Sequence, residues 1–306
     1  MIDYTVIVPV YKSASSLNEL YSRIDKVFIG IQKSYEIIFI DDGSPDNSWD
    51  VIRKMKQDSD TKNISGIKLS KNFGQHNAVF CGFEHARGNA IITIDDDLQV
   101  PPEEILKLLN AFEEKNCELV YGYFKKKHHS LFRNIGSWYI KKSGKLLNKA
   151  PGEGSSFRVL SRNLAEKILK HSQEFVYIDE LLLWYTNDIS FIPVEHQKRK
   201  YKKSGYSTAK LFQITFNLMI YYTAVPLKMM IYGGFASALI SFVIALYYIF
   251  KKVFFHHAPP GYTSIIVAIL FSTSIIIFSL GIIGEYLHRI YKVQNKKPPY
   301  SIKEKI

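Results

Sequence analysis

The sequence has few cysteines and lacks the short motifs of two common nucleotide-binding folds. Only two cysteines occur among 306 residues, Cys81 and Cys117. Neither has the spacing of a zinc site or of a disulfide framework, which fits a reducing compartment. No GxGxxG follows the first apolar segment and no GxxxxGK[ST] occurs, which argues against a dinucleotide site of that type and against a P-loop. The opening MIDYTVIVPV lacks a basic segment followed by a long apolar core, so no cleaved signal peptide is predicted.

Charged residues are missing from two long stretches, Met229–Phe250 and Ser264–Gly284. At about 1.5 Å per residue, each stretch is long enough to cross a bilayer core of about 30 Å. We therefore predict two transmembrane helices within a membrane region at residues 226–285. Lysines and arginines gather before the first span and after the second, whereas the connecting loop has only Lys251 and Lys252. The positive-inside rule then places both ends of the chain in the cytoplasm.

The chain is basic, with a formal net charge of +12. Because the basic residues gather beside the predicted spans, a membrane surface or a phosphorylated lipid is favoured as partner over nucleic acid. An apolar stripe at helical spacing predicts an interfacial amphipathic helix at residues 208–225. Residues 286–306 are expected to form a cytoplasmic tail. Small residues at fourfold spacing in the first span, Gly234 and Ala238, are compatible with helix packing in a homo-oligomer.

Residues 1–207 alternate between apolar runs and segments of helical periodicity. This alternation predicts an α/β domain with a mostly parallel sheet that helices cover on both faces. The strands are expected at Thr5–Tyr11, Tyr35–Ile40, Ile64–Leu69 and Ala90–Ile94. Ligands of such sheets bind beyond the carboxyl ends of the strands. Tyr11, Asp42 and Asp95–Asp97 all follow strands, so we expect them to share one site.

The acidic stretch DDDLQVPPE directly follows the last of these strands. In extended backbone, residues two apart share a face, so Asp95 and Asp97 converge while Asp96 points away. Two such carboxylates suit a hard divalent cation that also binds substrate phosphate. The alternative is a solvated acidic turn that caps the next helix.

Four segments carry a family resemblance, namely IVPVYKSASSL, IDDGSPDNS, LSKNFGQHNA and DDDLQVPPE. In this order they resemble family 2 glycosyltransferases of the GT-A fold. With two C-terminal spans, the chain is most similar to the polyprenyl-phosphate glycosyltransferases. The resemblance implies inverting transfer of one sugar from a nucleotide-diphosphate sugar to polyprenyl (undecaprenyl) phosphate. The reaction would take place at the cytoplasmic face of the bacterial inner membrane and yield a lipid-linked sugar donor for cell-envelope glycans.

The same resemblance implies roles for individual residues. Those that bind the nucleotide would be Pro9, Tyr11, Asp42 and Asp95. Asp95 and Asp97 would hold Mg²⁺ or Mn²⁺, and Gln99 would lie beside the sugar. The acceptor phosphate would contact basic and hydroxyl residues near the membrane, namely Lys125, Lys126, Arg133, Arg199 and Ser204. Of these, Arg199 is also expected to be catalytic.

Some positions depart from the family pattern. Lys12 and Ser13 stand where relatives usually have an Asn-Glu pair, and Ser155–Ser156 occupy a place where an aspartate is common. Asp179 either orients the acceptor or is only a carboxylate at a helix N-terminus. A processive polysaccharide synthase and a catalytically inactive membrane scaffold remain alternative functions. The sequence leaves open the sugar, and also the choice among UDP, GDP and dTDP.

Overall fold

The computed structural model describes residues 2–58, 63–124, 153–170, 177–197, 261–294 and 298–306, with a few further helical positions between 230 and 254. The chain forms two compact units. Unit 1 comprises Met1–Gly205 together with Lys296–Ile306, and unit 2 comprises Tyr206–Asn295. The chain thus leaves unit 1 once, forms unit 2, and returns to unit 1 for its last residues.

In the described part of unit 1, eight strands form one mixed sheet in the order β7-β5-β6-β4-β1-β2-β3-β8. Their bounds are β1 Tyr4–Val10, β2 Tyr35–Asp41, β3 Ile64–Leu69, β4 Ala90–Thr93, β5 Leu119–Phe124, β6 Glu153–Ser161, β7 Ile189–Val194 and β8 Ile302–Lys305. Strands β4, β1, β2 and β3 are parallel neighbours, which confirms the predicted parallel sheet. Strand β6 is antiparallel to both β4 and β5, and β7 is parallel to β5.

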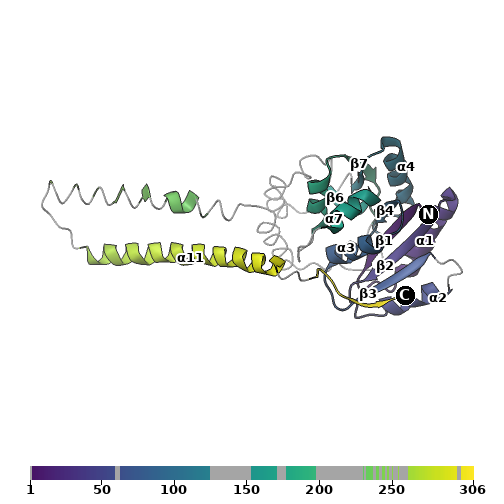
Figure 1. Cartoon of the computed structure of the whole chain (residues 1–306), viewed down its shortest axis with the longest axis horizontal. Helices are drawn as coiled ribbons and strands as arrows, with labels where there is room; N and C mark the ends of the chain where they lie inside the picture. The colour runs from purple at the N-terminus through teal and green to yellow at the C-terminus, as the bar shows by residue number, and fades with distance from the viewer. Residues whose placement is uncertain are drawn as a thin grey trace. The chain divides into compact units, whose positions relative to one another are not determined.

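Helices cover both faces of this sheet, as predicted (Figure 1). The helices that the described residues of unit 1 form are α1 Leu17–Ile31, α2 Ser48–Asp58, α3 Gln75–His85, the 3₁₀ turn η1 Pro102–Glu104, α4 Ile105–Lys115, α7 Arg162–Leu169 and α8 Ile178–Tyr185. Side chains of α1, α2 and α4 pack in one apolar cluster, and those of α3, α7 and α8 pack in a second. Each cluster also includes alternate residues of β1, because successive strand side chains point to opposite faces. Val6 and Val8 lie in the first cluster and Ile7 in the second.

The C-terminal residues form part of the unit 1 sheet, whereas the sequence indicates only a tail at 286–306. Strand β8 pairs antiparallel with β3 (Figure 1). Gly66 and Ile306 exchange backbone hydrogen bonds of 3.2 and 2.9 Å. The Glu304 carboxylate accepts a hydrogen bond from Trp49 Nε1 at 3.0 Å and pairs with Arg53 at 2.9 Å. The added strand satisfies the backbone groups at the edge of β3, which would otherwise be open to pairing with other chains.

The segments predicted at the membrane lie partly outside the described residues. Residues 208–225 lie outside them entirely, as do 10 of the 22 residues of the span predicted at 229–250. The span predicted at 264–284 falls within α11, Tyr262–Gln294. Among the helices that the described residues form, none is both long and apolar enough to cross a membrane.

Candidate active site

Three loops meet at the carboxyl ends of the neighbouring strands β1, β2 and β4. The backbone N–H of Asp42, after β2, donates to the carbonyl of Val10 at 2.9 Å. The backbone N–H of Tyr11, after β1, donates to Asp96 Oδ2 at 3.0 Å. The residues predicted to share one site therefore do lie together. Pro9 is part of the same corner, since it is buried in β1 opposite Ile40 of β2.

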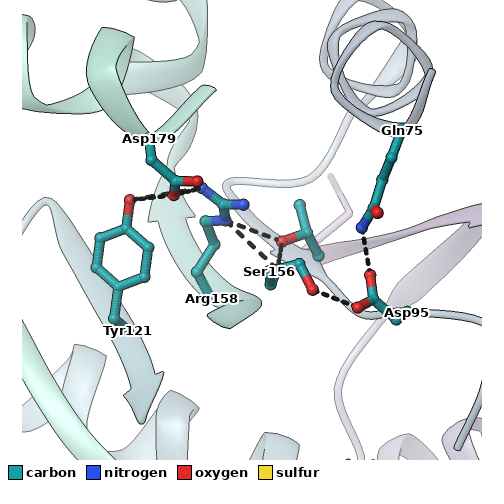
Figure 2. Close-up of polar contacts among 7 residues, drawn as sticks. Gln75, Asp95, Tyr121, Ser156, Arg158 and Asp179 are labelled. Carbon is teal, nitrogen blue, oxygen red and sulfur yellow. Dashed lines mark hydrogen bonds and ion pairs between the residues drawn. The ribbon is translucent and has the colours of Figure 1, made fainter. Parts of the chain in front are cut away.

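The half-buried Asp95 carboxylate is held from two sides (Figure 2). Gln75 Nε2, at the start of α3, donates to Oδ1 at 2.6 Å, and Ser156 Oγ, on β6, donates to Oδ2 at 2.5 Å. Burial raises the pKa of Asp95 to about 6. The Ser156 hydrogen bond opposes this shift, and the neighbouring carboxylates of Asp97 and Asp96 add to it. Negative charge is thus crowded at the end of β4 and favours a cation there.

Asp97 and Gln99 are fixed by a tight turn. Asp97 Oδ1 accepts the backbone N–H of Gln99 at 3.1 Å, and the intervening Leu98 is left-handed, with φ 56°. The carbonyl of Gln99 accepts the backbone N–H of Gln197 at 2.8 Å. The side-chain Nε2 of Gln99 lies 3.2 Å from His196 Nε2. The segment that follows β7 therefore holds Gln99 beside the carboxylates.

The sequence predicts that Asp96 points away from its two neighbours, and the structure shows which groups it contacts. Its Oδ2 accepts the Tyr11 backbone N–H and the Ser13 hydroxyl. Its backbone carbonyl accepts the Ser16 hydroxyl at 2.6 Å. Asp96 is therefore bonded to the loop between β1 and α1, a role that alternation along a strand does not reveal.

Asp42 lies against backbone amides at the start of α3. Its Oδ1 accepts the N–H of Phe73 at 2.6 Å and its Oδ2 that of Gly74 at 2.8 Å. The adjacent Gly43 has φ 62°, and a Cβ there would lie 2.5 Å from the backbone carbon of Lys71. Only glycine fits this close approach of two loops. Burial also raises the pKa of Asp41, the last residue of β2. The nucleotide contact predicted for Asp42 stays a prediction.

A buried ion pair between Arg158 and Asp179 lies close to Ser156, which in turn contacts Asp95 (Figure 2). Arg158, on β6, is only 2% exposed, and its Nη1 donates to Asp179 Oδ1, on α8, at 2.5 Å. The same Oδ1 accepts the Tyr121 hydroxyl at 2.9 Å. Arg158 Nε lies 3.3 Å from Thr93 Oγ1 and 3.4 Å from the Ser156 carbonyl. Asp179 thus compensates the charge of the buried Arg158. Neither role predicted for Asp179, orienting the acceptor or standing as a carboxylate at a helix N-terminus, includes this contact.

The sequence alone assigns no role to Gln75, Arg158 or His196. Gln75 stands within the quoted LSKNFGQHNA, and an arginine inside the otherwise apolar FRVL of β6 signals a buried cation that needs a partner. His196 gives no such signal, since its neighbours are polar. The residues predicted to bind the acceptor phosphate lie outside the described residues, namely Lys125, Lys126, Arg133, Arg199 and Ser204.

The donors at the end of β4 fit a hard divalent cation. Mg²⁺ in proteins commonly takes one or two carboxylates and completes its shell with water and substrate phosphates. Asp95 and Asp97 offer two carboxylates. Burial raises the pKa of Asp95 and the Asp97 and Asp96 carboxylates raise it further, so a cation here would stabilise the ionised form. The described part of the chain contains no group of three or more His, Cys, Asp or Glu side chains placed to hold a metal.

Solved structures share this fold at low sequence identity. Glucosyl-3-phosphoglycerate synthase from Mycobacterium tuberculosis, in complex with Mn²⁺ and UDP-glucose, is 12% identical with a TM-score of 0.53, over 72% of this chain and 77% of that one. Mannosyl-3-phosphoglycerate synthase from Rubrobacter xylanophilus is 12% identical with a TM-score of 0.52, over 76% and 75%. S. aureus TarS 1-349, in complex with UDP-GlcNAc, is 17% identical with a TM-score of 0.47, over 72% of this chain and 66% of its own, just under two thirds. The two synthases, whose TM-scores exceed 0.5, share the α/β, GT-A-like mixed-sheet fold with this chain.

Two family models match the sequence. The model described as GtrB C-terminal hairpin matches residues 225–290. The model described as glycosyl transferase family 2 matches residues 5–169, from β1 to the end of α7, and so includes the three loops and all three carboxylates that follow β4. This match covers more than half of the 306 residues, and the chain therefore belongs to glycosyl transferase family 2.

Proposed function

We propose that this protein transfers a single sugar from a nucleotide-diphosphate sugar to polyprenyl phosphate at the cytoplasmic face of the bacterial inner membrane. The observation that carries the proposal is the meeting of the Tyr11 loop, Asp42 and the Asp95–Asp97 carboxylates at one edge of a family 2 sheet. In open sheets of this kind, ligands bind beyond the carboxyl ends of the strands. Tyr11 is exposed there, with 39% of the residue accessible, and the Lys12 ammonium lies 5.3 Å from the centroid of its ring.

The donor diphosphate would lie over the carboxylates. Asp95 and Asp97 would hold Mg²⁺ or Mn²⁺, which supplies Lewis-acid assistance to the departing nucleotide diphosphate when bound. A solved structure of the same fold that binds UDP-glucose with Mn²⁺ supports this assignment. Gln75 and Ser156 orient Asp95, and His196 together with the Gln197 backbone orients Gln99 toward the sugar.

The acceptor is a phosphate oxygen, which is already anionic near neutral pH. That oxygen forms a bond to the anomeric carbon while the bond to the nucleotide diphosphate breaks, and the diphosphate leaves with the electron pair. In-line attack inverts the anomeric centre. A strong general base is unnecessary, so the protein must supply positioning and charge compensation. The match to the GtrB C-terminal hairpin supports a polyprenyl-phosphate acceptor, since GtrB is a polyprenyl-phosphate glycosyltransferase.

Helix α11 supports attachment to the membrane. Large apolar side chains are exposed along its described positions, among them Ile269, Phe271 and Phe278, which are 56%, 65% and 69% accessible. A helix with apolar residues all around is suited to lipid rather than to water. The Ser272 hydroxyl donates to the carbonyl of Ala268 at 2.8 Å, so this polar group is satisfied within the helix.

The path of the chain supports the predicted orientation. Unit 1 contains both residues 1–205 and residues 296–306, and β8 is a strand of its sheet. Both ends of the hairpin region therefore continue into the same folded unit, as expected if both lie on one side of the membrane. The basic residues at these ends favour the cytoplasmic side.

Transfer activity tests the proposal directly. The full chain, purified in detergent, is incubated with undecaprenyl phosphate and a panel of labelled UDP-, GDP- and dTDP-sugars. We expect one labelled sugar per lipid for at least one donor, and no transfer by Asp97→Asn when its thermal unfolding matches that of the unaltered chain. Full activity of Asp97→Asn would refute the metal-binding role. Products with many sugars would indicate a processive synthase instead.

A further inference from the structure

The loop between β1 and α1, residues 11–16, is held by hydrogen bonds from other parts of the sheet edge. The backbone N–H groups of Lys12 and Ser13 donate to Ser44 Oγ at 3.1 Å and Ser48 Oγ at 2.9 Å. The backbone N–H of Tyr11 and the hydroxyl of Ser13 both donate to Asp96 Oδ2. Two carboxylates accept hydrogen bonds from this loop. Asp46 Oδ2 accepts only the Ala14 backbone N–H, at 3.4 Å, whereas Asp96 Oδ2 accepts two groups, and hydrogen bonds to a charged group are the stronger kind.

The loop requires such support because its backbone is strained. Lys12 adopts a left-handed conformation with φ 56°, which is uncommon for a residue with a Cβ and persists only where neighbouring contacts enforce it. The two groups that Asp96 binds, on Tyr11 and Ser13, flank Lys12 on both sides. Ser13 is 1% exposed, so its hydroxyl needs a partner inside the protein.

The position of Asp96 separates it from the predicted metal ligands. Asp95 is oriented by α3 and β6, through Gln75 and Ser156. Asp97 is oriented by its own turn, through the Gln99 amide. Asp96 instead binds the β1 loop and, through its backbone carbonyl, the hydroxyl of Ser16 just before α1. The three consecutive carboxylates thus have three different sets of partners.

We propose that Asp96 is a positioning residue for the donor nucleotide: paired with Ser13, it fixes the strained loop so that the Tyr11 ring faces the base. This inference rests on the proposed function and assigns different roles to the three consecutive carboxylates. Asp95 and Asp97 serve the diphosphate and its cation, and Asp96 serves the nucleoside through the loop. Ser13, a departure from the usual family pattern, then has a defined partner in this chain.

The test measures nucleotide affinity in the full chain. UDP, GDP and dTDP with Mn²⁺ are titrated calorimetrically, and the tightest of the three is used for all variants. We expect Asp96→Ala to raise the Kd at least about tenfold, since two bonds to a charged acceptor are lost. Asp96→Asn keeps an acceptor oxygen and should raise the Kd less. Ser13→Ala should raise the Kd less in the Asp96→Ala background than in the unaltered chain, because the bond to Asp96 is already gone and only the 3.2 Å contact with the Tyr11 carbonyl remains to be lost.

A second readout separates positioning from metal binding. Each variant is given nucleotide at the same multiple of its own Kd, and Mn²⁺ is then titrated. The Mn²⁺ concentration that gives half-maximal nucleotide binding should be unchanged in Asp96→Ala and raised in Asp97→Asn. Asp50→Ala, at an exposed position in the first turn of α2, is the control that should leave both quantities unchanged. If Asp96→Ala does not fold, Asp96→Asn and Ser13→Ala carry the same test.

An unchanged Kd in folded Asp96 variants, or a Mn²⁺ shift as large as that of Asp97→Asn, would overturn the inference. Fully additive effects of the Ser13 and Asp96 substitutions would also overturn it. Failure of the unaltered chain to bind any of the three nucleotides would instead overturn the proposed function, and this inference with it.

Discussion

Replacing Asp95 by asparagine should stabilise the metal-free protein while abolishing transfer. The pKa of Asp95 is raised from 3.8 to about 6 in the folded chain, first by burial and then by the carboxylates of Asp97 and Asp96. One pKa unit corresponds to about 1.4 kcal/mol, so ionised Asp95 costs the folded state about 2–3 kcal/mol near pH 7. An amide of the same shape can still accept from Gln75 and can donate to the Ser156 oxygen, without the charge.

The sign of the pH dependence follows from linkage. Because the folded pKa is the higher one, the folded state binds more protons between about pH 4 and 6, and stability falls as pH rises through this window. The stabilising effect of Asp95→Asn should therefore be largest at pH 7 and shrink toward pH 4.

Thermal unfolding of the full chain in EDTA, for both proteins across this pH range, measures the effect. A gain of about 2 kcal/mol corresponds to a rise of about 4–8 °C in Tm for a domain of this size. A lower Tm for Asp95→Asn at pH 7, or a gain that does not depend on pH, would refute the reasoning. Adding Mn²⁺ should stabilise the unaltered chain and not the variant.

Other predictions test the parts of unit 1 that support the site. Arg158→Met should destabilise the protein by about 3–5 kcal/mol because Asp179 is left uncompensated, and adding Asp179→Leu should recover much of the loss in thermal unfolding. Deleting residues 298–306 exposes the edge of β3, so we expect a lower Tm and self-association in size-exclusion chromatography; a monodisperse, equally stable product would contradict this. Gly43→Ala should lower the Tm and weaken nucleotide binding, since its Cβ would meet the Lys71 backbone at 2.5 Å, and unchanged calorimetric affinity would argue against that packing.

The central parallel strands could be predicted from the sequence because local composition determines them. Near-continuous apolar runs such as β1 and β2 are buried on both faces, and their order along the chain places the following acidic residues at one edge. The stripe of α1 that packs on the sheet follows in the same way from helical spacing, from Leu17 to Phe28.

The remaining contacts depend on partners far apart in the chain. Strand β8 is four residues, IKEK, and three of them are charged, so the segment is too short and too polar to signal a strand without its partner β3. Arg158 is buried only because Asp179, on a different element, compensates its charge. Alternation in extended backbone predicts that Asp96 is separated from its neighbours, but β4 ends at Thr93 and Asp96 lies in a turn. Only the tertiary structure identifies its partners in the β1 loop.

Nucleotide binding with and without a divalent cation tests most directly whether the β4 carboxylates hold the donor through a metal. The measurement is calorimetric titration of UDP, GDP and dTDP into the full chain, with Mn²⁺ or with EDTA, for the unaltered protein and for Asp97→Asn. We expect at least one nucleotide to bind with Mn²⁺, and binding to be lost in EDTA and in Asp97→Asn. Equal affinity in EDTA, or in Asp97→Asn, would contradict this expectation.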